Sequence, residues 1–236
     1  MFNAWFAIPF WQRVLGAFVL GMLIGGLAPE VGVALKPLGD LFIKAIKMLV
    51  APLIFCAIVS AITDLNDGKK LGRLGAKTIG LFMLTAVIAS AIGLTLASVI
   101  DMSPVATLTA TEQNEKQIPG IAQVFLNFVP SNPFAALTEG NVLQIVVFAA
   151  LVGIAIQRLK GKGEPLRKTI KSGAEVMYEI TRMVLQLTPV GVLGLMSWVI
   201  GEYGFSTLLP LAKFFGVIFL AFLIHIVVVF GGFFFF

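Results

Sequence analysis

The sequence predicts an all-α protein that crosses a membrane several times, and three observations support this prediction. Hydrophobic residues make up 58% of the 236 residues, charged residues only 12%, and the mean hydropathy is +1.00. A soluble domain has about 25% charged residues, so this composition suits a lipid environment. Apolar runs near the length of a spanning helix recur along the chain, and positive residues gather between them.

Seven runs without a charged residue are candidate spans. They cover residues 14–29, 48–63, 78–100, 121–138, 140–157, 183–201 and 214–236. The second run extends back to residue 37 if Lys44 and Lys47 lie within the membrane. Residues 1–10 hold no basic stretch and no clear cleavage site, so the first run is expected to be a retained signal anchor with a cytoplasmic N-terminus.

Two short basic segments define the expected topology. Residues 64–77 and 158–171 hold most of the lysines and arginines, which indicates that both lie on the cytoplasmic side. Residues 101–120 are richer in acidic residues and are expected outside. The chain must then cross the membrane an odd number of times between residues 121 and 157, where two apolar runs occur. Pro130, Pro133 and Gly140 predict that one of these runs is a broken or re-entrant helix.

Three charges follow one face of a predicted helix that begins near Pro37. Asp40, Lys44 and Lys47 stand at i, i+4 and i+7. Lys44 is expected to reach back and pair with Asp40. Lys47 lies deeper, where a lysine is costly and usually meets a partner or a cavity. A functional contact and a merely tolerated charge are both open interpretations for Lys47.

Other features of the apolar runs carry weaker signals. Pro52 and Pro189 are each expected to kink a helix. His225 is expected to pack between helices, with a proton relay as the less favoured interpretation. Glu179 and Arg182 are spaced for an exposed ion pair. Two sets of small residues at four-residue spacing either allow close helix contact or fill lipid-facing helix: Ala17, Gly21 and Gly25, and Ala89, Gly93 and Ala97.

The motifs of an enzyme are missing from the sequence. It has no metal-spaced His or Asp cluster, no G-x-S-x-G and no P-loop, so neither a catalytic residue nor a cofactor or metal ligand is assigned. Cys56 is the single cysteine, which excludes an internal disulfide and a cysteine-based metal site. The net charge is +5, but most of the positive residues lie in the two short basic segments between apolar runs, and no nucleic-acid recognition motif accompanies them. A transporter is therefore favoured over an enzyme or a nucleic-acid-binding protein, and an ion channel is a distant alternative.

Four stretches of the chain resemble the dicarboxylate/amino acid:cation symporter family, which includes glutamate transporters and bacterial C4-dicarboxylate carriers. They are PLGDLFIKAIKMLVAPLIF (37–55), LGRLGAKTIG (71–80), VPSNPFAALTEGNVLQIVVFA (129–149) and LTPVGVLGLM (187–196). The resemblance implies a homotrimer in the plasma (inner) membrane. It also implies scaffold helices 1 and 2 at residues 1–63, scaffold helices 4 (broken) and 5 at 118–203, and mobile transport-domain helices 3 and 6 at 74–100 and 207–236.

The resemblance further implies that substrate and most ion ligands come from a C-terminal half. That half is absent from this sequence, which ends GGFFFF (231–236), so the chain is expected to be a fragment truncated in about the sixth helix and no substrate-binding residue is assigned. The implied function is secondary active symport of glutamate, aspartate or a C4-dicarboxylate with sodium ions or protons. The alternative is a scaffold and trimerisation fragment that does not transport.

Two residues take roles from the resemblance alone. Thr85 matches a helix 3 threonine near a sodium site, although Ala86 and Phe82 replace residues that often carry a hydroxyl group there. The coupling ion, Na+ or H+, therefore stays open. Lys47 matches a basic residue that faces the mobile domain, and it is the candidate contact between scaffold and transport domain.

Overall fold

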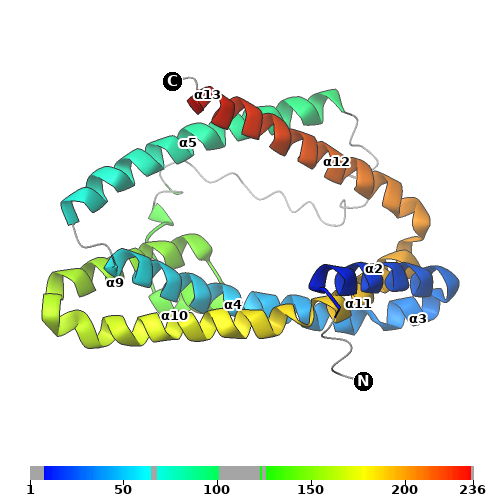
Figure 1. Ribbon diagram of the computed structural model, residues 1–236, viewed down its shortest axis with the longest axis horizontal. Helices are drawn as coiled ribbons and strands as arrows, with labels where there is room; N and C mark the ends of the chain where they lie inside the picture. The colour runs from blue at the N-terminus through cyan, green and yellow to red at the C-terminus, as the bar shows by residue number, and fades with distance from the viewer. Residues whose placement is uncertain (1–7, 65–67, 101–122, 124–125, 235–236) are drawn as a thin grey trace. The chain divides into compact units, whose positions relative to one another are not determined.

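The computed structural model describes residues 8–64, 68–100, 123 and 126–234, and every regular element in these ranges is a helix. The chain forms two units, each built from two separate segments (Figure 1). Unit 1 comprises residues 1–66 and 117–204, and unit 2 comprises residues 67–116 and 205–236. The predicted scaffold ranges fall in unit 1 and the predicted transport-domain ranges fall in unit 2. Their roles as scaffold and transport domain remain predictions.

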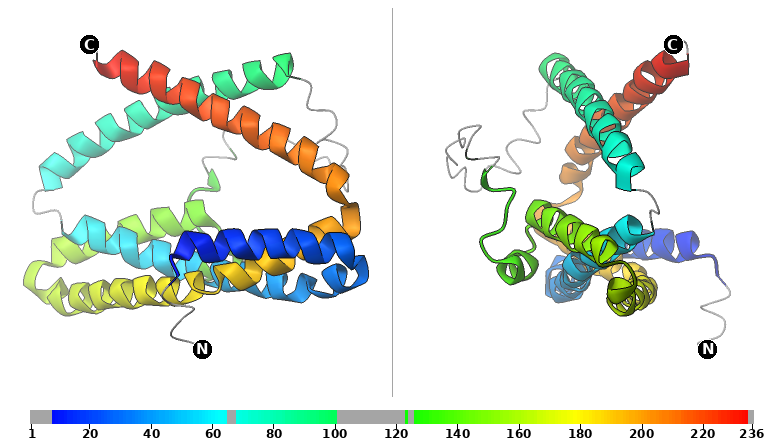
Figure 2. Two further views of the ribbon diagram at one scale, coloured as in Figure 1. Left: turned by 45° about the vertical axis from the view of Figure 1, so that its right-hand side comes forward. Right: turned by 90° about the vertical axis from the view of Figure 1, so that its left-hand side faces the viewer.

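Unit 1 is a bundle of α-helices that come from its two chain segments. Its elements are α2 (Phe10–Leu27), α3 (Pro29–Ala34), α4 (Lys36–Thr63), α8 (Pro133–Glu139), α9 (Val142–Leu159), the 3-10 turn η1 (Lys160–Gly163), α10 (Glu164–Leu185) and α11 (Thr188–Tyr203). Helices α2 and α3 pack against α11, while α4 packs against α9, α10 and α11. Figure 2 shows α4 and α10 side by side in one part of this unit.

Glycine positions allow α2 and α11 to approach closely. The buried residues of α2 are Ala17, Gly21 and Gly25, so of the two interpretations of their spacing, close helix contact is the one that the structure confirms. A Cβ built on Gly21 would lie 2.9 Å from the Leu193 carbonyl oxygen of α11. No side chain larger than hydrogen fits there without moving a helix.

The second set of small residues has no such role in the described structure. Ala89 and Ala97 are exposed, and a Cβ built on Gly93 would meet no neighbouring atom within 4 Å. Of the two interpretations of this set, the described chain therefore favours lipid-facing helix over close contact. Four-residue spacing creates a smooth helix face, but it does not determine which helix, if any, lies against that face.

A second core lies where α4 crosses α9. Val59, Ala149 and Ile156 are buried there. The rings of Phe55 and Phe148 stack beside them with centroids 5.7 Å apart. Dense packing of apolar side chains holds these two helices together, because bilayer lipid offers them no hydrophobic driving force.

Unit 2 consists of α5 (Gly68–Val99), η2 (Phe205–Thr207), α12 (Leu208–His225), the π-helical turn η3 (Ile226–Phe230) and α13 (Gly231–Phe234). Helix α5 packs against α12. No residue of α12 is buried, in contrast to the cores of unit 1. His225 is half-buried at the end of α12, and its Nδ1 atom has no hydrogen-bond partner.

The prediction of an all-α, multi-pass membrane protein is confirmed. Within the described ranges, five helical segments are long and apolar enough to cross a membrane. They are Phe10–Leu27, Pro29–Thr63, Gly80–Val99, Val142–Leu185 and Phe205–Val229. The run at 183–201 is divided, because α10 ends at Leu185 and α11 begins at Thr188 with Pro189 in its first turn. The kink expected at Pro189 is thus a break between two helices.

The basic segments between the apolar runs are mostly helical. Helix α5 already begins at Gly68, and α10 begins at Glu164 after the short η1 turn. Lysine, arginine and glutamate are good helix formers, so a charge run indicates where a helix leaves the apolar layer and not where it ends. The external segment expected at residues 101–120 lies outside the described residues.

Candidate functional site

A cavity of about 540 Å³ lies between the middle of α4 and the end of α8. Pockets that bind small molecules have volumes of about 300–1,000 Å³. Its lining comes from two short sequence stretches within unit 1: Lys47, Met48, Val50, Ala51 and Pro52, and Leu137, Thr138, Glu139 and Gly140. This is where the predicted candidate Lys47 is found.

The broken-helix prediction is confirmed on one side of this cavity. Asn132 begins α8, and its side-chain oxygen accepts hydrogen bonds from the backbone N–H groups of Phe134 at 2.9 Å and Ala135 at 3.4 Å. Gly140 ends α8 after only seven residues in a left-handed conformation, with φ 68° and ψ 29°. A glycine adopts this conformation without the steric cost of a Cβ. Glu139 is thereby placed as the last helical residue at the mouth of the cavity.

Pro52 shapes the other side of the cavity. It lies inside α4 and has no backbone N–H, so the Met48 carbonyl four residues earlier loses its usual helical donor. Met48 and Pro52 both line the cavity. The proline therefore leaves a backbone hydrogen-bond acceptor without its helical donor beside the cavity.

Lys47 is exposed on α4 and forms no ion pair among the described residues. The pair expected between Lys44 and Asp40 is also missing from the described ion pairs, so that prediction is wrong. An exposed pair at this spacing gains only about 0.3–0.5 kcal/mol and must order two side chains. The ion pair predicted on α10 is confirmed, with 3.3 Å between Arg182 Nη1 and Glu179 Oε2.

Thr85 lies in α5, in unit 2. Its hydroxyl donates a hydrogen bond to the Phe82 carbonyl oxygen at 3.0 Å. The hydroxyl proton is thus engaged within the helix, which leaves the oxygen lone pairs available to a cation. Ala86 follows with no side-chain oxygen, and the Phe82 ring is exposed. Thr85 and Lys47 belong to different units, so each is described by itself.

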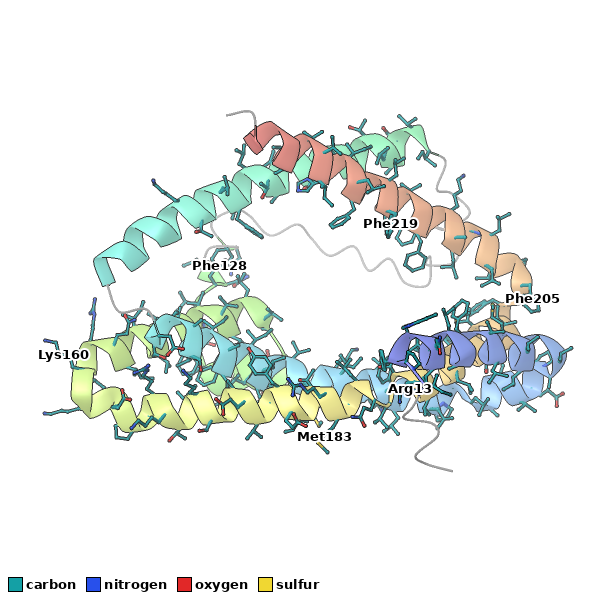
Figure 3. The ribbon with its side chains drawn as sticks, viewed as in Figure 1. Arg13, Phe128, Lys160, Met183, Phe205 and Phe219 are labelled. Carbon is teal, nitrogen blue, oxygen red and sulfur yellow. The ribbon has the colours of Figure 1, made fainter. Side chains whose placement is uncertain are left out.

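An ion-pair cluster joins α4 to the start of α10. Asp64 accepts a hydrogen bond from Arg167 Nη2 at 3.0 Å and one from Lys171 Nζ at 3.4 Å. Arg167 Nη1 also donates to Glu164 Oε2 at 3.1 Å. The hydrogen bond from Arg167 lowers the pKa of the Asp64 carboxyl from its ordinary value, and Lys171 lowers it further. We call this set the Asp64 cluster. It lies beside the η1 turn, where Figure 3 shows Lys160.

Neither Glu139 nor Asp64 was predicted from the sequence as a functional residue. Glu139 stands inside an otherwise uncharged stretch between two helix breaks, and that isolation was the available signal. Asp64 and Arg167 are 103 positions apart, so no local pattern connects them. In the described ranges, no three His, Cys, Asp or Glu residues gather in a way that could hold a metal ion.

These features define a multi-pass helical membrane protein with a broken helix beside a charged, partly apolar cavity. The sequence profile of the sodium:dicarboxylate symporter family matches residues 10–236. The chain belongs to this family, and the resemblance stated from its sequence stretches is confirmed.

Two relatives are bacterial proteins named C4-dicarboxylate transport protein. The one from Serratia proteamaculans (strain 568) is 35% identical over 231 residues, which cover 93% of this chain and 53% of the relative. The one from Pseudomonas fluorescens (strain SBW25) is 37% identical over 229 residues, which cover 93% of this chain and 52% of the relative. The chain thus spans about half the length of these relatives.

Proposed function

We propose that this chain is part of a secondary active symporter that takes up a C4-dicarboxylate, with glutamate and aspartate as the alternative substrates. The names of the relatives favour the dicarboxylate. The observation that carries the proposal is that this chain, a member of the family, divides into two units whose segments alternate along the sequence. Such an arrangement suits a transporter in which one body moves against another around a midplane site. The protein is then a carrier and not an enzyme, and it needs no organic cofactor.

In this proposal unit 1 is the static scaffold and unit 2 belongs to the mobile transport domain. The buried cores at Val59 and Ile145 give unit 1 the rigidity that a scaffold needs, whereas α12 buries no residue within unit 2. A homotrimer in the plasma membrane, with the N-terminus and the η1 turn in the cytoplasm, completes the arrangement. Lys47 would contact the mobile domain, and Thr85 would help to bind the coupling ion.

The coupling ion is proposed to be sodium, with the proton as the alternative. The family description and the hydroxyl oxygen of Thr85 favour sodium, because Na+ is a hard cation that prefers oxygen ligands. The replacement of neighbouring oxygen donors by Ala86 favours the proton.

A second proposal concerns the 236 residues by themselves. They would act as a scaffold and trimerisation module that does not transport. The close helix packing of unit 1 around α11 supports this function, since it gives the described chain a core of its own.

Uptake by reconstituted vesicles tests both proposals. Vesicles would contain either the 236-residue chain or a full-length protein that carries it, and radiolabelled succinate and aspartate would be supplied under a sodium or a proton gradient. We expect sodium-driven succinate uptake by the full-length protein and none by the 236-residue chain. A full-length protein that moves neither substrate under either gradient would refute the symport proposal. Monomers of the 236-residue chain in native gels would refute the trimerisation module.

A further inference from the structure

We propose that the cavity between α4 and α8 binds the headgroup of a phospholipid that carries both a phosphate and a primary ammonium, as phosphatidylethanolamine does. The proposal rests on the geometry of unit 1 and does not depend on the proposed transport activity. It assigns Lys47 to the lipid headgroup, in place of the contact with the mobile domain proposed above.

The cavity presents opposite charges that do not satisfy each other. Lys47 and Glu139 both line it, and no described ion pair or hydrogen bond occupies either side chain. A purely anionic ligand would be attracted by Lys47 but repelled by Glu139. A simple cation would be attracted by Glu139 but repelled by Lys47. A zwitterion whose two charges are separated by a short linker matches both residues.

Hydrogen-bond acceptors outnumber donors in the lining. The Met48 carbonyl lacks its helical donor because of Pro52. At the end of α8 the Ala136 carbonyl accepts from the backbone N–H of Asn141, but the carbonyls of the last three residues, Leu137 to Glu139, lie beyond the reach of intrahelical donors. The Thr138 hydroxyl is already engaged, since it donates to the carbonyl oxygens of Ala135 at 3.0 Å and Phe134 at 3.2 Å. A primary ammonium brings three N–H donors to such a surface. Lys47 is the side chain of the lining that can donate to the phosphate.

The position of the cavity along α4 places it at the level of lipid headgroups. Lys47 precedes Thr63 by 16 residues, which corresponds to about 24 Å along an α-helix. The Asp64 cluster directly follows Thr63 and consists of exposed charges, so it marks one polar boundary of the membrane. Because the hydrocarbon layer is about 30 Å thick, Lys47 lies just inside the opposite boundary, within the reach of a long side chain. Measured from Thr63, Lys47 is therefore less deep than its distance from Pro37 predicted.

Exposed apolar side chains accompany the charges. Met48 is 62% exposed at the cavity, and Phe134 on α8 is 73% exposed. Val142 follows the cavity on α9 and is 44% exposed. These side chains can pack against acyl chains while the headgroup occupies the cavity. This combination favours a membrane lipid over a soluble zwitterion.

The first test changes the lipid and leaves the protein unaltered. The purified chain would be titrated in mild detergent with phosphatidylethanolamine or phosphatidylcholine, and the bound lipid counted by native mass spectrometry. Both headgroups carry one phosphate and one positive charge, but the trimethylammonium of phosphatidylcholine has no N–H to donate. We expect retention of phosphatidylethanolamine to be stronger by about tenfold, the effect of losing a charge-assisted hydrogen bond.

The second test changes the cavity. Lys47→Met and Glu139→Gln are each expected to weaken phosphatidylethanolamine retention by about tenfold. Glu139→Gln should reduce the preference over phosphatidylcholine, whereas Lys47→Met should weaken retention of both lipids. Lys44→Met is the matched control, because Lys44 lies on the same helix outside the cavity, and it should retain lipid like the unaltered chain.

Four outcomes would overturn the proposal. Equal retention of the two lipids would remove the role of the ammonium, and unchanged retention in both cavity variants would place the lipid elsewhere. Displacement by free glycerophosphoethanolamine at the same concentration would identify a soluble zwitterion as the ligand. Loss of oligomers in the cavity variants, without bound lipid in the unaltered chain, would instead show that a second copy covers the cavity.

Discussion

A Cβ built on Gly25 would lie 2.5 Å from the carbonyl oxygen of Ser197. The two residues belong to α2 and α11, and the backbone of one helix therefore rests directly on the other. Gly32 in α3 meets the same carbonyl oxygen at the same distance. The Ser197 backbone is thus the point on which the first two helices of unit 1 converge.

This contact predicts that Gly25→Ala destabilises unit 1. The added methyl group would strike backbone atoms, which cannot move aside as a flexible side chain can, and overpacking of this kind costs about 1–3 kcal/mol. The measurement is thermal unfolding of the purified chain in detergent, followed by the loss of its monodisperse peak in size-exclusion chromatography.

Gly16→Ala is the matched control on the same helix. A Cβ at Gly16 meets no neighbouring atom within 4 Å, and alanine is the better helix former by about 1 kcal/mol. This variant should unfold at the same temperature as the unaltered chain or slightly above it. Equal unfolding temperatures for the two variants would show that the close contact of α2 with α11 does not limit stability.

Lys160→Gly is expected to stabilise the turn between α9 and α10. Lys160 has φ 50° and ψ −129°, and it is the single non-glycine residue with positive φ in the described chain. A residue with a Cβ pays about 1–3 kcal/mol in such a sparsely populated region, and glycine relieves most of this strain. The rise in unfolding temperature would be measured in the same detergent.

Lys162→Gly controls for the loss of a lysine from the η1 turn. Lys162 does not have a positive φ, so replacement by glycine only increases the freedom of the unfolded chain. It should leave stability unchanged or lower it slightly. A stabilising effect of the same size at both positions would point to charge repulsion among the lysines and would contradict the strain at Lys160.

The Asp64 cluster predicts a stability difference that disappears in acid. Asp64 has a lowered pKa in the folded chain, so its contribution is fully present above the unfolded-state pKa of about 4 and is lost as the pH falls through the folded value. Asp64→Asn should therefore lower stability at pH 7, by less than about 1 kcal/mol because the pair is exposed to solvent. At the lowest pH the two chains should unfold alike.

Glu175→Gln is the control for this pH dependence. Glu175 lies on the same helix as Arg167, and no described ion pair includes it. Its replacement should leave the change in stability between pH 7 and acid the same as in the unaltered chain. If the stability of Asp64→Asn differed from that of the unaltered chain by the same amount at every pH, the carboxylate charge would not be what joins α4 to α10.

Local chemistry explains which features were predictable from the sequence. Pro133 and Gly140 act on their own backbone, so the break before α9 followed from their identity alone. The face of Gly21 and Gly25 followed from the helical period, and the low charge content indicated the membrane. These signals need no knowledge of distant contacts.

The features that escaped prediction depend on partners far away in the chain. The cavity joins Lys47 to Glu139, and the cluster joins Asp64 to Arg167, through packing that no spacing rule encodes. Helix ends were misjudged where lysines follow an apolar run, since hydropathy reports the boundary of the lipid and not that of the hydrogen-bonded helix. The pairing of Lys44 with Asp40 failed because favourable spacing permits a weak ion pair without requiring it.

Thr85→Val tests the proposed ion ligand in a full-length protein that carries this chain. Valine keeps the branched shape but removes the hydroxyl oxygen, whose proton is committed to the Phe82 carbonyl and whose lone pairs are free. If sodium binds there, the sodium concentration for half-maximal succinate uptake should rise by about tenfold, because the bound ion loses one oxygen ligand. Thr85→Ser should behave like the unaltered protein.

Thr95→Val separates ion binding from helix stability. Thr95 lies on the same helix, and its hydroxyl donates to the Ala91 carbonyl oxygen at 2.7 Å, so the substitution removes a comparable intrahelical hydrogen bond. Its sodium dependence should not change. If Thr85→Val and Thr95→Val raise the sodium requirement equally, the effect comes from the helix backbone. If neither variant changes uptake, and a proton gradient alone drives uptake, the protein is coupled to protons. The replacement of an oxygen donor by Ala86 agrees with that outcome, because a bound sodium ion needs a shell of oxygen ligands and a proton does not.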